Sequence, residues 1–323
     1  MITTLVYRDH KLFAQDPSPD ELAILRAEPG VMLWIDLSQP TPSEITQILE
    51  KLFVFHPLAI EDCVNDTPFP KLEAYEEYLY FVMHAVDTSE APAFKTTELD
   101  LFLGKNFLVT FHHRPLNPVN AALERFLRTA NDPVRGPDRF AHTILDNMVE
   151  AYKPPLEALR QEIDKVEEGV LREISADELF PKVVALRKQL SRLRQIVRPQ
   201  REIATELAQG KHVFIRSATV PYLRDLTEEL TRIETQTQVW AEQLIISFRI
   251  YINKSSHEAN QGIRVLTGIT ALTFPALLIG GWYGMNFKYM PELGALSGYP
   301  LAFTLMLAST YAIYLFMRRK KWL

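Results

Sequence analysis

The sequence predicts an α+β/α membrane protein, with an N-terminal α/β domain, a helical middle region and two membrane spans near the C-terminus. Strand-like and helix-like stretches alternate over about the first 115 residues, apolar residues then recur at steps of three and four, and two long uncharged segments follow. Of the 323 residues, 47% are hydrophobic and 23% are charged, and this composition excludes a disordered or low-complexity chain.

The charge of the chain is unevenly distributed. The net charge is −5, but residues 263–323 carry +5 and residues 1–262 carry −10. An acidic body of this kind is not expected to bind nucleic acid. The single cysteine, Cys63, excludes a disulfide framework and a multi-cysteine metal centre, and it fits a reducing compartment.

Residues 1–137 are predicted to form the α/β domain. The segment Thr41-Pro-Ser-Glu44 is typical of a helix start, with a capping box and proline at the first position. Neither glycine-rich phosphate-binding motif occurs, so no nucleotide site or other organic cofactor is expected. The predicted strands are rich in aromatic and β-branched residues and comprise Thr4–Tyr7, Met32–Asp36, Tyr78–His84, Leu99–Leu103 and Phe107–Phe111.

Residues 138–220 are predicted to form an antiparallel helical hairpin. Apolar residues step by three or four from Leu145 to Val170 and again from Leu179 to Val197. A capping box, Ser175–Glu178, is expected to begin the second helix. A solvated surface is the first interpretation of the outer acidic face, and attraction of cations is the alternative; this face comprises Glu162, Asp164, Glu167, Glu168, Asp177 and Glu178.

Residues 221–262 are predicted to form a stalk helix that continues into the first membrane span. No proline or glycine interrupts Tyr222–Gln261, and the apolar pattern continues past Gly262. One helix from Pro221 to Trp282 would be roughly 93 Å long. Its steps of three and four favour packing against parallel partners.

Residues 263–323 are predicted to hold two spans, near Val265–Trp282 and Tyr299–Met317, because each uncharged segment exceeds the roughly 20 residues that a spanning helix needs. Buried core helices are the alternative. The connecting loop, about 283–298, carries only Lys288 and Glu292. The tail Arg318–Lys321 carries four positive charges, so both termini are expected in the cytoplasm of a multi-pass cell-membrane protein.

The first span ends in Tyr283-Gly-Met-Asn-Phe287, and this motif resembles the CorA family of magnesium and cobalt transport channels. The resemblance covers the whole chain, since His56–Asp62, Val220–Asp225, Gly298-Tyr-Pro300 and the basic tail are also similar to family signatures. It implies a funnel-shaped homopentamer in the lipid bilayer that transports divalent cations, chiefly Mg²⁺ and also Co²⁺ or Ni²⁺, without enzymatic activity.

The motif suits a selectivity filter made of Gly284, Met285 and Asn286. Mg²⁺ dehydrates reluctantly, so neutral oxygens set far apart can bind the hydrated ion. Five Asn286 side-chain carbonyls and the Gly284 backbone carbonyls would form such a ring, at helix C-termini that each carry about half a negative charge. Glu292 belongs to the expected outer loop.

The resemblance places the pore wall along one side of the first span, and lipid or intersubunit packing is the alternative. Ile263 and Leu266 would form an apolar constriction. Leu277 departs from the family, which often has a threonine there. The expected pore-lining residues are Asn260, Ile263, Leu266 (or Thr267), Thr270, Phe274, Leu277 and Gly281.

The resemblance further implies that cytosolic Mg²⁺ bridges carboxylates of neighbouring protomers and holds the pore shut. Asp225 and Asp87 are the corresponding residues. Two other functions remain open at this stage: a proton-coupled Zn²⁺ transporter of the related ZntB branch, which usually departs from Gly-Met-Asn at the middle residue, and a membrane-anchored scaffold protein.

Overall fold

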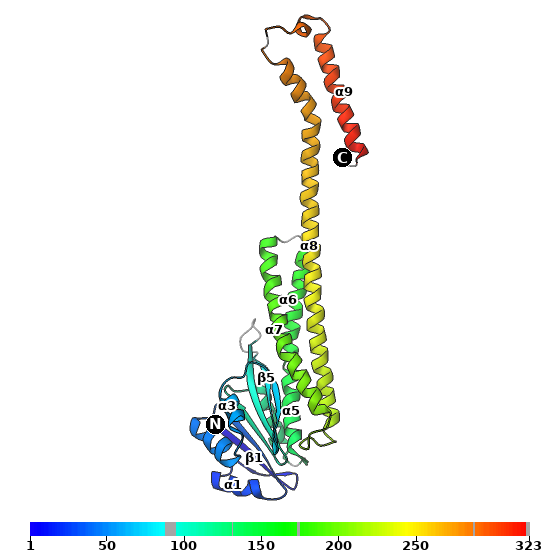
Figure 1. Cartoon of the computed structure of the whole chain (residues 1–323). Helices are drawn as coiled ribbons and strands as arrows, with labels where there is room; N and C mark the ends of the chain where they lie inside the picture. Colours follow the sequence, from blue (N-terminus) through cyan, green and yellow to red (C-terminus); the bar gives the residue numbers. More distant parts are fainter. Residues whose placement is uncertain (88–94, 131, 173–174, 287, 321–323) are drawn as a thin grey trace. The chain divides into compact units, whose positions relative to one another are not determined.

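The computed structural model describes residues 1–87, 95–130, 132–172, 175–286 and 288–320 (Figure 1). These residues form two compact units, Met1–Ile246 and Ser247–Leu323. The helix α8, Val220–Tyr283, begins in the first unit and ends in the second.

The first unit contains a seven-stranded sheet in the order β2-β1-β3-β7-β6-β5-β4. Neighbouring strands are antiparallel except β3 and β7, which pair in parallel with Leu33 opposite Phe107. The strands are β1 (Ile2–Arg8), β2 (Lys11–Gln15), β3 (Val31–Ser38), β4 (Lys71–Ala74), β5 (Tyr78–Asp87), β6 (Lys95–Gly104) and β7 (Phe107–His112).

Helices cover both faces of this sheet and bury a separate core on each. Side chains alternate along a strand, so Leu5 and Trp34 face one core while Val6 and Ile35 face the other. The second core includes α1 (Pro19–Ala27), the π-helix η1 (Thr46–Leu52) that continues α2 (Pro42–Ile45), and α3 (Pro57–Val64). The first core includes α4 (Asn117–Arg128), α5 (Pro137–Glu150), α6 (Lys153–Leu171), α7 (Ala176–Ala208) and the start of α8.

The helices α6, α7 and α8 lie side by side in the first unit (Figure 1). Arg201 of α7 pairs with Glu234 of α8 at 2.9 Å, and Arg160 of α6 donates to Gln243 of α8 at 3.2 Å. The apolar residues that step by three and four, including Leu190 and Leu230, are buried along this packing. The neighbouring helices α6 and α7 lie within the region in which the sequence predicts a helical hairpin.

The five predicted strands and the Thr41 capping box are confirmed, but three details of the prediction are wrong. The strands β2 and β4 were not predicted, because they are short segments at the two edges of the sheet. The Ser175 side chain makes no capping hydrogen bond. The first hairpin helix is divided into two helices, α5 and α6, at Ala151. Pro154 and Pro155 follow a few residues later, and their rings disfavour a continuous helix.

The second unit consists of the end of α8, a 3-10 turn η2 (Pro291–Gly294) and α9 (Gly298–Arg319). Pro275 lies inside α8 without ending it. The helix α8 spans 64 residues, so the predicted continuation of the stalk helix into the first span is confirmed.

Candidate ion-conducting segment

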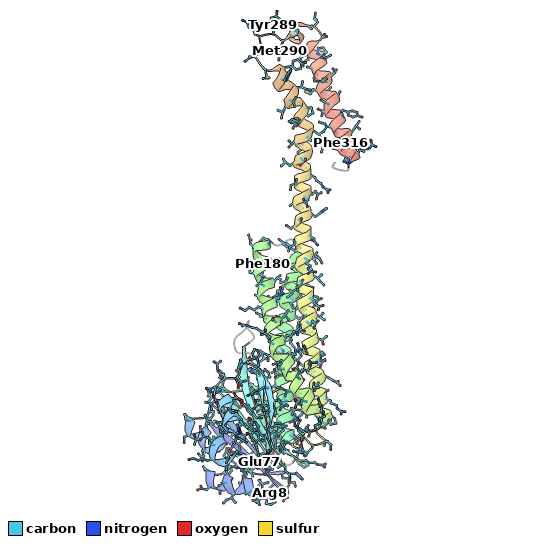
Figure 2. All side chains as sticks on the ribbon, in the orientation of Figure 1. Arg8, Glu77, Phe180, Tyr289, Met290 and Phe316 are labelled. Carbon is cyan, nitrogen blue, oxygen red and sulfur yellow. The ribbon has the colours of Figure 1, made fainter. Side chains whose placement is uncertain are left out.

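Two helices, α8 and α9, are long and apolar enough to cross a membrane. Only 11% of the most apolar window of α8 and 6% of that of α9 is buried, so these segments are not core helices of a soluble fold. Side chains project from both helices along their length (Figure 2), and Phe316 of α9 is among those exposed. Surfaces of this kind require lipid or protein partners.

The end of α8 has a tight backbone geometry that requires glycine. The Gly284 N–H donates to the Gly280 carbonyl at 2.9 Å, and the Met285 N–H donates to the Trp282 carbonyl at 3.3 Å. A Cβ at position 284 would lie 2.9 Å from the same Gly280 oxygen, which is closer than real Cβ contacts allow. The glycine of the motif therefore closes the helix where no side chain fits.

Met285 and Asn286 follow this helix end and are exposed. The Asn286 amide has no hydrogen-bond partner among the described residues, which leaves its carbonyl oxygen available to a hydrated ion. Phe287 lies outside the described residues, as does the side chain of Glu292, whose backbone belongs to η2.

Three of the predicted pore residues, Leu266, Thr270 and Phe274, lie together along one shallow groove of about 420 Å³. Thr267 and Ala271 also line this groove, and Ile313 of α9 borders it. Ile313 is not among the residues predicted from the sequence; the expected antiparallel packing of two consecutive spans is the signal that could have suggested a contact from α9. The Thr270 hydroxyl donates to the Leu266 carbonyl at 2.9 Å and keeps its lone pairs free.

The remaining predicted pore residues do not line this groove. Asn260, Ile263, Leu277 and Gly281 are exposed along α8. A Cβ built at Gly262, Gly280 or Gly281 would meet no heavy atom within 4 Å. No contact within the described chain explains these glycines, whereas close approach of a neighbouring helix would.

The two predicted regulatory carboxylates belong to the first unit. Asp225 is exposed and lies in the second turn of α8, beyond a first turn without acidic residues. The helix dipole acts mainly on the first turn, so it does not explain well why position 225 is acidic. Burial lowers the pKa of the neighbouring His142, although the negative charges of Asp146 and Asp225 act to raise it. Asp87 is the last residue of β5, opposite Lys95, and its side chain lies outside the described residues.

Within the described ranges of the single chain, no group of three or more His, Cys, Asp and Glu residues could hold a metal ion. The outer acidic face of the hairpin is partly neutralised within its own helix, where Lys165 pairs with Glu162 and Arg160 with Asp164. This pairing agrees with a solvated surface.

The model of the family described as "CorA-like Mg2+ transporter protein" matches residues 29–319. The cobalt/magnesium transport protein CorA of Thermotoga maritima is 29% identical over 293 residues, which cover 90% of this chain and 83% of that protein.

Solved structures show the same fold over nearly the whole chain. The complete structure of the CorA magnesium transporter from Methanocaldococcus jannaschii has a TM-score of 0.76 at 20% identity and covers 99% of this chain and 98% of that one. The full-length CmaX protein has a TM-score of 0.77 at 19% identity and covers 99% and 97%.

Proposed function

Because the chain belongs to the family of CorA-like Mg²⁺ transporter proteins, we propose that it transports divalent cations across a membrane, chiefly Mg²⁺ and also Co²⁺ or Ni²⁺. Its two apolar helices supply the membrane-spanning part. The Thermotoga maritima relative is named for cobalt and magnesium transport, which agrees with this cargo.

The mouth of the pore is formed by Gly284, Met285 and Asn286. The observation that carries this assignment is the helix end itself, where Gly284 closes the backbone and leaves the Asn286 amide exposed with no partner among the described residues. Backbone carbonyls at a helix C-terminus carry partial negative charge, and an amide oxygen adds a neutral ligand. A ring of these oxygens, contributed by several copies of the chain, attracts a hydrated cation without stripping its water.

Several copies of the chain form the pore, and a homopentamer is the assembly that we propose. Two spans per chain cannot enclose an aqueous path, while a ring of first spans can. The glycines of α8 that have empty space beside them, including Gly281, support close packing between protomers. The basic tail supports a topology with both termini in the cytoplasm, because positive charges favour that side of a membrane.

Cytosolic Mg²⁺ closes this pore by bridging Asp225 of one protomer and Asp87 of the next. Two facing carboxylates repel each other when the cation leaves, so the closed ring loses stability. The cation must bind the closed ring more tightly than the open one in order to shift the equilibrium.

The test of the mouth is Mg²⁺ uptake by proteoliposomes that contain full-length protein. Asn286→Ala removes the oxygen ring, and uptake should fall at least about tenfold while the oligomer persists in mild detergent. Ser297→Ala, which removes another exposed polar group before α9, is the matched control and should keep normal uptake. Near-normal uptake by Asn286→Ala contradicts the assignment.

A further inference from the structure

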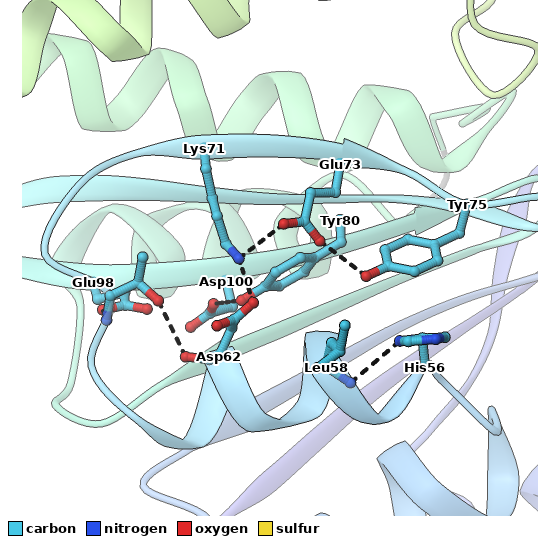
Figure 3. Close-up of polar contacts among 10 residues, drawn as sticks. His56, Leu58, Asp62, Lys71, Glu73, Tyr75, Tyr80, Glu98 and Asp100 are labelled. Carbon is cyan, nitrogen blue, oxygen red and sulfur yellow. Dashed lines mark hydrogen bonds and ion pairs between the residues drawn. The ribbon is translucent and has the colours of Figure 1, made fainter.

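Two acidic residues, Glu98 and Asp100, are buried between the sheet and α3, far from the membrane helices in sequence (Figure 3). They occupy alternate positions on β6 and therefore share one face of the sheet. Cys63 of α3 and Tyr80 of β5 are fully buried on the same side.

Each of the two carboxyl groups has one oxygen with a partner and one without. The Tyr80 hydroxyl donates to Asp100 Oδ1 at 2.6 Å, and the Thr67 N–H donates to Glu98 Oε2. Asp100 Oδ2 and Glu98 Oε1 are buried and have no nitrogen or oxygen partner among the described residues. Burying a charged carboxylate that lacks partners costs several kcal/mol, so the charged form is disfavoured at both positions.

Among the described residues, the cation near this pair is shared with other carboxylates. Lys71 of β4 lies beside the pair (Figure 3), and its ammonium group is held by Asp62 and by Glu73, the latter at 3.1 Å. Of the groups on β5, His84 donates through Nε2 to the Thr67 carbonyl at 3.1 Å, and burial lowers its pKa, which disfavours the charged ring. Asp66, in the loop after α3, adds a further negative charge near Glu98.

The groups that face the pair therefore carry an excess of negative charge. From α3 come Asp62 and the Cys63 thiol, whose pKa burial raises. The groups that face the pair from β4 are Lys71 and Glu73. The other facing groups are Asp66, Tyr80 and His84.

A metal ion could neutralise such a pair, but no group of three suitable ligands occurs in the part of the chain that the structure describes. A proton needs only one oxygen. We infer that Glu98 and Asp100 form a buried proton-binding site that holds α3 and the following loop, residues 65–70, against the sheet while it is protonated.

The pKa directions agree with this geometry. Burial raises the pKa of Glu98 to about 7, and burial followed by the charge of Glu98 raises the pKa of Asp100 well above its usual range. Both values exceed those of the unfolded chain, so the folded state binds more protons. The stabilisation is complete below the unfolded values and is lost as the pH rises through the folded ones.

The single cysteine of the chain reports the opening of this region. Cys63 is 0% exposed, so a thiol reagent reaches it only when α3 separates from the sheet. The labelling rate of Cys63 is measured from pH 5.5 to 8.0, both in the folded full-length protein in detergent and in the same protein unfolded in denaturant. The protection of Cys63 is the unfolded rate divided by the folded rate at each pH. This ratio removes the intrinsic pH dependence of the thiol.

The protection of Cys63 should fall about tenfold or more over this range, because one proton released on opening changes the ratio by up to about tenfold per pH unit. Glu98→Gln, which keeps the shape and removes the titration, should abolish most of the fall, and Asp100→Asn is the second variant. Glu61→Gln removes an exposed charge from α3 and should keep the wild-type slope. Constant wild-type protection, or an unchanged slope in both variants, overturns the inference.

This site is separate from the proposed transport function, since labelling of Cys63 requires no ion flux. Failure of the Asn286→Ala test would leave the proton site standing, and constant protection of Cys63 would leave the pore mouth standing.

Discussion

Gly284 is the residue whose identity the structure explains most directly. Its missing Cβ allows the helix end to close against the Gly280 carbonyl at 2.9 Å, and any side chain would have to displace backbone. Gly294, in the same outer segment, has no heavy atom within 4 Å of the position that a Cβ would occupy. The backbone therefore excludes a side chain at position 284 and leaves space for one at position 294.

Replacing Gly284 with alanine should reduce Mg²⁺ uptake by about tenfold or more, because the helix end must shift and displace Asn286. Gly294→Ala is the control and should keep uptake within about twofold, since the added methyl group meets open space. Proteoliposome uptake measures both variants. Equal uptake by the two would show that the helix end tolerates a side chain.

Residue types alone could not predict the buried acidic pair. Glu98 and Asp100 alternate with Leu99 and Leu101, a pattern that is typical of a strand with one solvated face. The structure buries both faces of β6, because α3 covers the side that carries the acids.

The motif at Gly284–Asn286 could be predicted from the sequence, since its residues are contiguous and lie directly after a span.

At the scale of elements, α8 joins the first unit to the second as one helix of 64 residues. The sequence predicted this helix well, because neither proline nor glycine occurs over a long stretch before the span. It predicted the edge strands and the division around Ala151 poorly, because those features depend on short segments whose periodicity is weak.

Ile263 of α8 is expected to narrow the pore by excluding water. Ile263→Ser should therefore raise the Mg²⁺ leak through reconstituted protein several-fold when cytosolic-side Mg²⁺ is high. Ile269→Ser is a matched control, because Ile269 is 57% exposed against 61% for Ile263 but points to a different side of the helix. Leak that rises equally in both variants, or falls in Ile263→Ser, would place the constriction elsewhere.

For the whole molecule, the proposed regulation rests on a cation that neighbouring protomers share. In the proposal, Asp225 of one protomer and Asp87 of the next supply the two carboxylates. Cytosolic Mg²⁺ would then stabilise the assembled closed ring in preference to the open one.

Wild-type protein should accordingly resist trypsin better as Mg²⁺ rises from micromolar to tens of millimolar. The Asp87→Ala/Asp225→Ala variant should lose this response, while Asp177→Ala, an exposed carboxylate at the start of α7, should keep it. Digestion patterns on denaturing gels provide the measurement. Full Mg²⁺-dependent protection in the double variant would reject the two carboxylates as the sensor.

The proposed function requires that cations flow through the assembled protein. The most direct measurement is uptake of Mg²⁺ into proteoliposomes that contain only the purified full-length protein, compared with protein-free vesicles and with Zn²⁺ under an imposed pH gradient. We predict Mg²⁺ uptake well above that of empty vesicles and independent of the gradient. Mg²⁺ uptake no greater than that of empty vesicles, or transport of Zn²⁺ alone driven by the pH gradient, would contradict it.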